Sequence, residues 1–353
     1  MASKQEFIPL MAPPSPQKYG KQRSLRQAYR GILQMKFKLQ YQDIIINNKL
    51  IRKGDRDCDR RYSAMKPFLE RYKQDGHFNV LDFGANCGYY TWMIKQDYPN
   101  AQITMVEGKE IIKDIYELNN QVKGVKLINE FIHLNELKEM AKTKHYDLIL
   151  LLSVLHHFNE DVLDDLIDTF IQMGTTVLFE IDEPDHPNYR RLEKPVYEAV
   201  MKKKPIQINT WIDLERPMYY YSKDEIVFNT HVESGMNLAN QHTWMINNQF
   251  GWFGHTNLYP GTLNLRSQRP INFCKNQAVK VAMGYFILPA YLNGYPIFSM
   301  MKDFSPNSTF IEILSPKKLR QKFYLMDSDP VTLSFKKDFI REGRNGYLNC
   351  NII

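Results

Sequence analysis

The sequence predicts an α/β fold, a parallel sheet wrapped by helices, followed by a second and mostly β domain. Apolar strand patterns alternate with helical patterns from about residue 79 to residue 181, and this alternation is typical of parallel sheets. Past about residue 228, short β-like runs broken by Gly, Pro and Asn replace the helical periodicity. A loop that contains two glycines follows the first predicted strand, so the α/β part also carries a candidate nucleotide cradle.

The N-terminal region is predicted to be an extension of the α/β part. Residues 1–22 combine polar residues with four prolines, which indicates a flexible leader. Residues 25–46 are basic, poor in Gly and Pro, and apolar at helical spacing, which predicts a helix. A charged stretch then leads into a helix expected over residues 62–72. We therefore assign residues 1–57 to a leader and helical extension.

The α/β domain is predicted over residues 58–228. Its strands are apolar runs of four to seven residues, and its helices have apolar residues at a period near 3.6. The expected strands cover residues 79–83, 103–106, 125–129, 147–153 and 176–181, and the expected helices cover residues 90–96, 109–120 and 161–173.

The second domain is predicted over residues 229–353, after a connection near residues 222–230. Helical periodicity almost disappears there, and short strands separated by turn residues favour a small barrel. The expected strands cover residues 243–246, 262–266, 279–288, 296–300, 309–314 and 331–335.

Composition limits the class of protein. The chain has 353 residues and 43% hydrophobic residues, enough for about two globular domains of ~150 residues each. No apolar run approaches the ~20 residues of a membrane helix, so we expect no membrane span. The four cysteines are scattered without a C-x-x-C pair, which favours a reducing cytoplasm and no zinc site. The net charge of +7 is spread along the chain, so it only weakly favours a polyanionic or phosphorylated partner.

The glycine loop and the end of the next strand together suggest a nucleoside site. Gly84 and Gly88 would let the backbone come close to a ligand, and the following helix begins with unpaired N–H groups. Their spacing differs from G-x-G-x-x-G, so a dinucleotide is not the first expectation. Glu107 closes the second strand about 20 residues later, where its two carboxylate oxygens could accept both hydroxyl hydrogens of a ribose.

These motifs resemble class I S-adenosylmethionine (SAM) methyltransferases. The order L-D-x-G-x-x-x-G matches their first motif, and the segment over residues 146–158 resembles their fourth-strand motif beside the methyl donor. The resemblance implies a Rossmann-like methyltransferase sheet. It also implies SAM as cofactor, with the methionine end, the ribose and the methyl-donor region contacted by Asp82, Gly84, Asn86, Gly88, Glu107 and Ser153.

Two adjacent histidines stand at the expected mouth of this sheet. His156 or His157 could act as a base or hold an anionic acceptor, and we favour His157; alternatively, one of them caps the next helix. A phosphate or carboxylate acceptor would need no strong base. No Asp-Pro-Pro-Tyr, Asn-Pro-Pro-Tyr or Pro-Cys motif is present, which disfavours nucleobases as acceptors. The acidic run at residues 180–184 could bind a polar substrate, although a solvated loop fits equally well. Arg216 could pair with an anion, with packing at the sheet edge as the alternative.

The second domain resembles the archaeal CTP-dependent riboflavin kinases, which are small cradle-loop barrels. The resemblance rests on residues 259–266, which read Tyr-Pro-Gly-Thr-Leu-Asn-Leu-Arg, and on residues 310–329. It implies that Thr262 and Asn264 hold a nucleotide-bound magnesium ion, and that Gly235 and Gly261 contact CTP. The Gly-rich loop of the family is replaced after Gly235 by side-chain-bearing residues.

The two resemblances together predict a bifunctional enzyme. It would phosphorylate and methylate a hydroxylated small molecule, a sugar or a glycan end, with SAM, magnesium and CTP. One alternative keeps the methyltransferase but makes the barrel a non-catalytic substrate-binding module, as the altered loop favours. A second alternative, an RNA-binding methyltransferase, is the weakest because the basic residues are dispersed. The methyl acceptor and the oligomeric state stay open.

Overall fold

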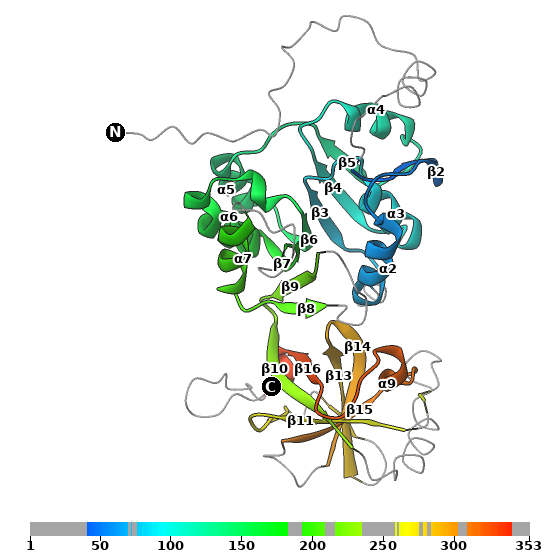
Figure 1. Ribbon diagram of the computed structural model, residues 1–353, viewed down its shortest axis with the longest axis vertical. Coiled ribbons are helices and arrows are strands. Elements are labelled where there is room, and N and C mark those ends of the chain that lie inside the picture. Colours follow the sequence, from blue (N-terminus) through cyan, green and yellow to red (C-terminus); the bar gives the residue numbers. More distant parts are fainter. Residues whose placement is uncertain are drawn as a thin grey trace, which may run out of the picture. The chain divides into compact units, whose positions relative to one another are not determined.

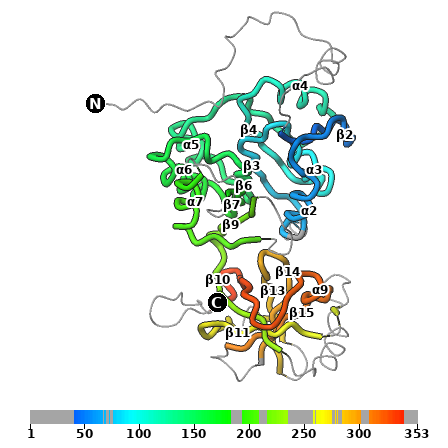
Figure 2. Tube along the Cα trace, in the orientation of Figure 1, coloured from blue at the N-terminus to red at the C-terminus, as the bar shows by residue number. Residues whose placement is uncertain are grey.

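The computed structural model describes residues 41–69, 72, 76–182, 193–208, 216–234, 258–259, 261–274, 278–280, 284–302 and 309–340. The described residues divide into two compact units, one made of residues 41–207 and 216–223 and the other of residue 208 and residues 224–340. Figures 1 and 2 show an α/β unit and a β unit. Each unit has its own hydrophobic core.

The α/β unit is built on a seven-stranded sheet in the order β5-β4-β3-β6-β7-β9-β8. The first five strands in this order pair in parallel, and β9 pairs antiparallel to β7. The predicted Rossmann-like sheet is therefore confirmed. The strands are β3 (Asn79–Phe83), β4 (Gln102–Val106), β5 (Val125–Ile128), β6 (Tyr146–Leu152), β7 (Gly174–Glu180), β8 (Ile206–Ile208) and β9 (Met218–Ser222).

Helices cover both faces of this sheet, as Figure 1 shows. The run of apolar residues in β6 is buried because the strand lies in the middle of the sheet with helices on both sides. On one face, α5, α6 and α7 pack with β6 and β7 into one hydrophobic cluster. The helices of the unit are α2 (Cys58–Leu69), α3 (Tyr89–Asp97), α4 (Ile111–Leu118), α5 (Leu134–Thr143), α6 (Leu163–Met173) and α7 (Glu193–Met201).

The start of the described chain corrects one prediction. Residues 44–46 belong to the strand β1 (Ile44–Ile46), which pairs with β2 (Lys49–Arg52), and not to the helix expected over residues 25–46. Three consecutive β-branched isoleucines favour a strand. Asn47 and Asn48 form the connecting turn with φ of 50° and 61°, a conformation that asparagine tolerates. Residues 25–40 lie outside the described part of the chain.

The second unit is a closed antiparallel barrel of six strands, so the predicted small, mostly β barrel is confirmed. The pairing runs β13-β14-β15-β11-β10-β16, and β16 pairs back with β13 at Tyr291 and Leu292. A short strand β12 (Val279–Lys280) adds to β13 outside the ring. The barrel strands are β10 (Glu225–Glu233), β11 (Leu263–Ser267), β13 (Tyr285–Leu292), β14 (Tyr295–Lys302), β15 (Phe310–Leu314) and β16 (Pro330–Lys336).

Two details of the barrel differ from the sequence prediction. β10 occupies most of the region expected to be a connection near residues 222–230, because its mixture of apolar and polar residues did not stand out as a strand. The strand expected at residues 243–246 lies outside the described residues. The barrel core is formed by inward-facing aliphatic and aromatic side chains, including Leu265, Leu292, Ile311, Leu333 and Phe335.

Two further expectations concern the whole chain. No helix in the described ranges is long and apolar enough to cross a membrane. Cys58 and Cys87 are free and buried, whereas Cys274 is disulfide-bonded.

Candidate active site

The glycine loop lies between β3 and α3 and is shaped by three residues with left-handed backbone. Gly84, Asn86 and Gly88 have φ of 75°, 54° and 73°. A Cβ on Gly84 would lie 2.5 Å from Cγ2 of Val154, and one on Gly88 would lie 2.6 Å from Cε of Met105. Neither position has room for a side chain, so the two glycines are required by packing as well as by backbone conformation.

Glu107 ties this loop to the end of β4. Its Oε2 accepts a hydrogen bond from the N–H of Asn86 at 2.8 Å, and its Oε1 accepts one from the N–H of Lys109 at 3.0 Å. The residue is 8% exposed. Each carboxylate oxygen can accept a further hydrogen. A carboxylate with spare acceptor capacity, held beside the glycine loop, fits the ribose of a nucleoside cofactor.

Asp82 has a different position from the other predicted cofactor residues. It lies within β3, is 3% exposed, and its Oδ2 accepts a hydrogen bond of 2.6 Å from the hydroxyl of Thr91 on α3. Burial raises the pKa of Asp82 to about 6, and the nearby charge of Glu107 also raises it. In the structure Asp82 therefore fastens α3 to β3 below the loop, and its direct contact with a cofactor stays a prediction.

Ser153 and the two histidines follow the end of β6. Ser153 has φ of 54°, and its hydroxyl oxygen accepts a hydrogen bond of 3.1 Å from Nη1 of Arg216. His156 and His157 belong to a single 3₁₀ turn, with ring centroids 4.2 Å apart. Burial, with a smaller contribution from the charge of Lys109, lowers the pKa of His157. His157, the favoured one of the two histidines predicted as catalytic, is therefore harder to protonate than a free imidazole.

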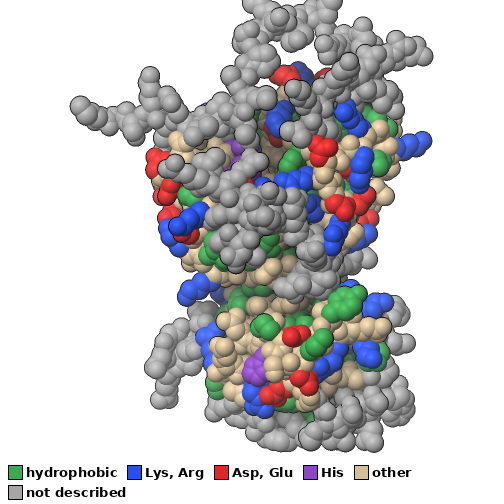
Figure 3. Space-filling model, viewed as in Figure 1, with side chains coloured by type: hydrophobic (Ala, Val, Ile, Leu, Met, Phe, Trp, Pro, Cys, Tyr) green, Lys and Arg blue, Asp and Glu red, His purple; other side chains and the backbone are tan. Residues whose placement is uncertain are grey.

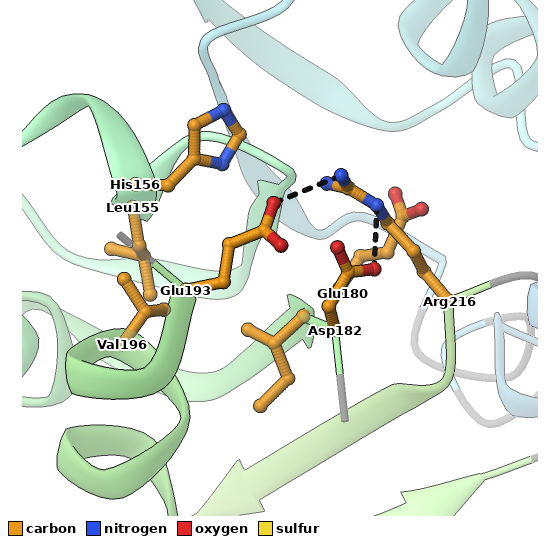
Figure 4. Close-up of a pocket in the computed structure, with 8 residues that line it drawn as sticks. Leu155, His156, Glu180, Asp182, Glu193, Val196 and Arg216 are labelled. Carbon is orange, nitrogen blue, oxygen red and sulfur yellow. Dashed lines mark hydrogen bonds and ion pairs between the residues drawn. The ribbon is translucent and has the colours of Figure 1, made fainter. Parts of the chain in front are cut away.

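A small pocket, with room for about one water molecule, lies beside Ser153 at the carboxyl ends of β6 and β7. Its polar and apolar lining residues, shown in Figure 4, are Leu155, His156, Glu180, Ile181, Asp182, Glu193, Val196 and Arg216. Of the two predicted catalytic histidines, His156 lines this pocket and His157 does not.

Two ion-pair groups organise the polar side of the pocket. Arg216 contacts Oδ1 of Asp182 through Nε at 2.7 Å and Oε1 of Glu193 through Nη2 at 3.0 Å. Glu180 pairs with Arg61 of α2, and both side chains are almost fully buried. These contacts join α2, β7, α7 and the segment before β9. Each buried carboxylate in these groups contacts an arginine, and a buried charge without such a partner would destabilise the fold.

Sequence reasoning found the group of Asp182, Glu193 and Arg216 only in part. Asp182 and Arg216 drew attention as members of an acidic run and of a Tyr-rich segment, but neither pattern indicated that they meet. No sequence pattern singled out Glu193, because nothing in the sequence indicates that it meets Asp182, 11 positions earlier, or Arg216, 23 positions later. Only the carboxyl-end rule for parallel sheets pointed to this edge.

The predicted nucleotide and metal residues of the barrel are described only in part. Thr262 donates a hydrogen bond of 3.2 Å from its hydroxyl to Oδ1 of Asn264, and Asn264 is 6% exposed. Gly261 precedes them with φ of 136°, whereas Gly235 lies outside the described residues. No group of three or more His, Cys, Asp or Glu that could hold a metal ion occurs among the described residues.

Comparison with known proteins gives matches only to solved structures. No family model and no curated protein matches the chain. The bifunctional kinase-methyltransferase WbdD matches with 16% identity and a TM-score of 0.43, over 57% of this chain and 47% of the WbdD chain. The chain therefore spans about half the length of that protein.

Two single-activity methyltransferases also match. N-methyltransferase NodS from Bradyrhizobium japonicum, in complex with S-adenosyl-L-homocysteine, has 13% identity and a TM-score of 0.35, over 48% of this chain and 89% of its own. Magnesium protoporphyrin IX methyltransferase ChlM from Synechocystis, with bound SAM, has 11% identity and a TM-score of 0.34, over 48% of this chain and 85% of its own.

Proposed function

We propose that the α/β unit is a SAM-dependent methyltransferase. The observation that carries this proposal is the position of Glu107, whose carboxylate holds the glycine loop and keeps acceptor capacity at the end of the second parallel strand. When bound, SAM would supply a methyl group on a positively charged sulfur. Methyl transfer then needs little more than alignment and, for a protonated acceptor, removal of a proton.

The residues of this chain would divide the binding of SAM between them. Gly84 and Gly88 leave the backbone free of side chains where the loop turns into α3. The glycine loop itself would hold the methionine end, because the first N–H of α3, that of Tyr89, already donates to Oε1 of Gln42 at 3.2 Å. Glu107 would accept hydrogen bonds from the ribose hydroxyls, while His156 and His157 are proposed to contact the acceptor.

Isothermal titration calorimetry with SAM tests this proposal. Glu107→Gln replaces a charge-assisted hydrogen bond by a neutral one, so we expect affinity for SAM to fall by about 10- to 100-fold. Glu110→Gln is the matched control: it lies three residues away, is exposed, and makes no side-chain cap to α4. Wild-type affinity in Glu107→Gln, or no binding by the unaltered protein, would contradict the proposal.

We further propose that the barrel gives the protein a second, nucleotide-dependent activity. A closed six-stranded barrel and the adjacent Thr262 and Asn264 oxygens support a magnesium-CTP site that would include Gly235 and Gly261. The enzyme would then phosphorylate as well as methylate a hydroxylated small molecule, a sugar or a glycan end. A non-catalytic binding module is the second candidate, favoured by the mutual hydrogen bond that already engages the buried Asn264 oxygen.

Nucleotide binding distinguishes these two candidates. Calorimetry with CTP, with and without magnesium, should show metal-dependent binding that disappears in Thr262→Val and persists in Thr332→Val, a control on β16. Binding of a neutral oligosaccharide without metal, and no binding of CTP, would instead support the module.

A further inference from the structure

The pocket at the ends of β6 and β7 contains more acid than its arginine can neutralise. Asp182 and Glu193 both contact the single guanidinium of Arg216. The side chain of Asp182 is fully buried and that of Glu193 is 6% exposed, while Arg216 is 12% exposed. Figure 4 shows the two carboxyl groups on the same side of Arg216, with His156 across the pocket. Two buried carboxylates and one guanidinium leave one negative charge.

A shared proton would relieve this excess. Burial raises the pKa of Asp182, a hydrogen bond with Glu193 raises it further, and Arg216 opposes the shift. Like-charged carboxylates in contact titrate as a pair, with one proton held much more tightly than usual.

The other groups that face this pair leave it as the proton-binding group of the pocket. Glu180 is already neutralised by Arg61. Arg56 adds a weaker attraction to the ionised form of Asp182, and it lies over the ring of Tyr41 with 5.0 Å between Cζ and the ring centroid. Burial raises the pKa of Tyr41, so that phenol stays protonated. His156 lines the opposite wall.

We propose that this pocket takes the hydroxyl end of the methyl acceptor and that the Asp182–Glu193 pair receives the hydroxyl proton. This inference rests on the proposed methyltransferase function. In the reaction the methyl–sulfur bond breaks and its electron pair stays on the sulfur. A bond forms between the methyl carbon and the acceptor oxygen, and the hydroxyl proton moves to the ionised pair. Charge balances because the sulfonium becomes a neutral thioether while the pair loses one negative charge.

The charge of the pocket selects this acceptor class. In its ionised form the pair with Arg216 carries one negative charge, which repels a phosphate or carboxylate oxygen. An ammonium group would be attracted, but buried carboxylates would stabilise its protonated, unreactive form. A hydroxyl is neutral and can donate its hydrogen to either carboxylate. The water-sized space and the apolar wall of Leu155, Ile181 and Val196 leave room for a hydroxyl group and not for a whole substrate.

The first test needs no acceptor. Difference infrared spectroscopy of the protein without cofactor, titrated between about pH 4 and pH 9, should show the carbonyl band of a buried protonated carboxyl. The band should be lost in Asp182→Asn or in Glu193→Gln. It should persist in Glu198→Gln, an exposed control on the same helix, whose side chain is 59% exposed. Absence of the band in the unaltered protein, or its persistence in both variants, would overturn the shared proton.

The second test measures methyl transfer from SAM to three related sugars. Methyl glucoside offers hydroxyl groups. Glucosamine and glucose 6-phosphate, each blocked at its hydroxyls, offer an amine and a phosphate. We expect transfer to the hydroxyl compound, with kcat/KM rising with pH through the raised pKa of the pair. Asp182→Asn should lower kcat/KM by about 100- to 10,000-fold while the affinity for SAM in calorimetry stays unchanged. Glu193→Gln gives the same comparison if Asp182→Asn does not fold.

The outcomes separate this inference from the function on which it rests. Loss of SAM binding by the unaltered protein would remove the methyltransferase proposal itself. Retained SAM binding with transfer only to the amine or the phosphate, or to none of the three sugars, would overturn the hydroxyl assignment alone. An unchanged pH profile in both carboxyl variants, with a changed profile in His156→Asn, would move the proton acceptor to the histidine.

Discussion

At Gly84 the backbone conformation and a neighbouring side chain both exclude a Cβ. We expect Gly84→Ala to lower the free energy of unfolding by about 2 to 4 kcal/mol, from left-handed strain and from overlap with Val154. Gly76→Ala is the control, since Gly76 has φ of 72° but no atom within 4 Å of the Cβ position, and it should cost only about 1 to 2 kcal/mol. Urea unfolding followed by tryptophan fluorescence measures both, and equal losses would show that the contact with Val154 is unimportant.

Asp82 makes a residue-scale prediction about pH. Its pKa of about 6 lies above the ~3.9 of an unfolded chain, so the folded state binds more protons between these values and its stability falls as pH rises. We expect this fall to amount to about 3 kcal/mol and to be absent in Asp82→Asn, which keeps an oxygen for the hydroxyl of Thr91. Urea unfolding at about pH 4, 5, 6 and 7 compares the two proteins. Parallel curves for both would refute the assignment.

Individual site residues were predictable from the sequence where they lie close together along one βαβ segment. Gly84, Gly88 and Glu107 stand at fixed intervals along one βαβ segment, so their proximity follows from local geometry. The group formed by Asp182, Glu193 and Arg216 depends on the return of β9 beside β7. That pairing is a tertiary event, and no short-range pattern encodes it.

At the scale of elements, the hairpin of β1 and β2 depends on one buried side chain at the C-cap of α4. Asn119 accepts a hydrogen bond from the N–H of Asn47 at 2.8 Å and donates one to the carbonyl of Ile45 at 2.9 Å. Asn119→Leu would leave both backbone groups without these partners, so we expect a loss of about 2 to 5 kcal/mol and faster amide exchange in residues 44–46. The exposed neighbour Asn120, changed to Leu, should have little effect.

Elements were predictable in proportion to how uniformly they are buried. β3, β4, β6 and β7 are apolar runs buried on both faces, so periodicity alone identified them. β10 alternates buried and partly exposed residues, and the first hairpin was hidden because three isoleucines continued an apparently helical pattern. The Asn-Asn pair after those isoleucines was a turn signal that could have placed this hairpin.

At the scale of the whole molecule, two separate cores predict two separate responses to ligands. SAM at about 100 times its dissociation constant should stabilise the α/β unit by about 2.7 kcal/mol. Hydrogen exchange followed by mass spectrometry should therefore show protection in β3, β4 and α3 but none in the barrel strands. Magnesium-CTP should protect the barrel alone. Equal protection of both units by either ligand would contradict independent sites.

Closure of the barrel also imposes an order on folding. The hydroxyl of Thr230 on β10 bonds the carbonyl of Val331 on β16, a partner 101 residues later in the chain. All five parallel strands of the α/β sheet precede β10, so they would leave the ribosome before β16, the last strand of the barrel, is synthesised. Until β16 emerges, β10 would offer an unpaired edge to any passing strand, which makes the interval between their syntheses the period of greatest aggregation risk for the nascent chain.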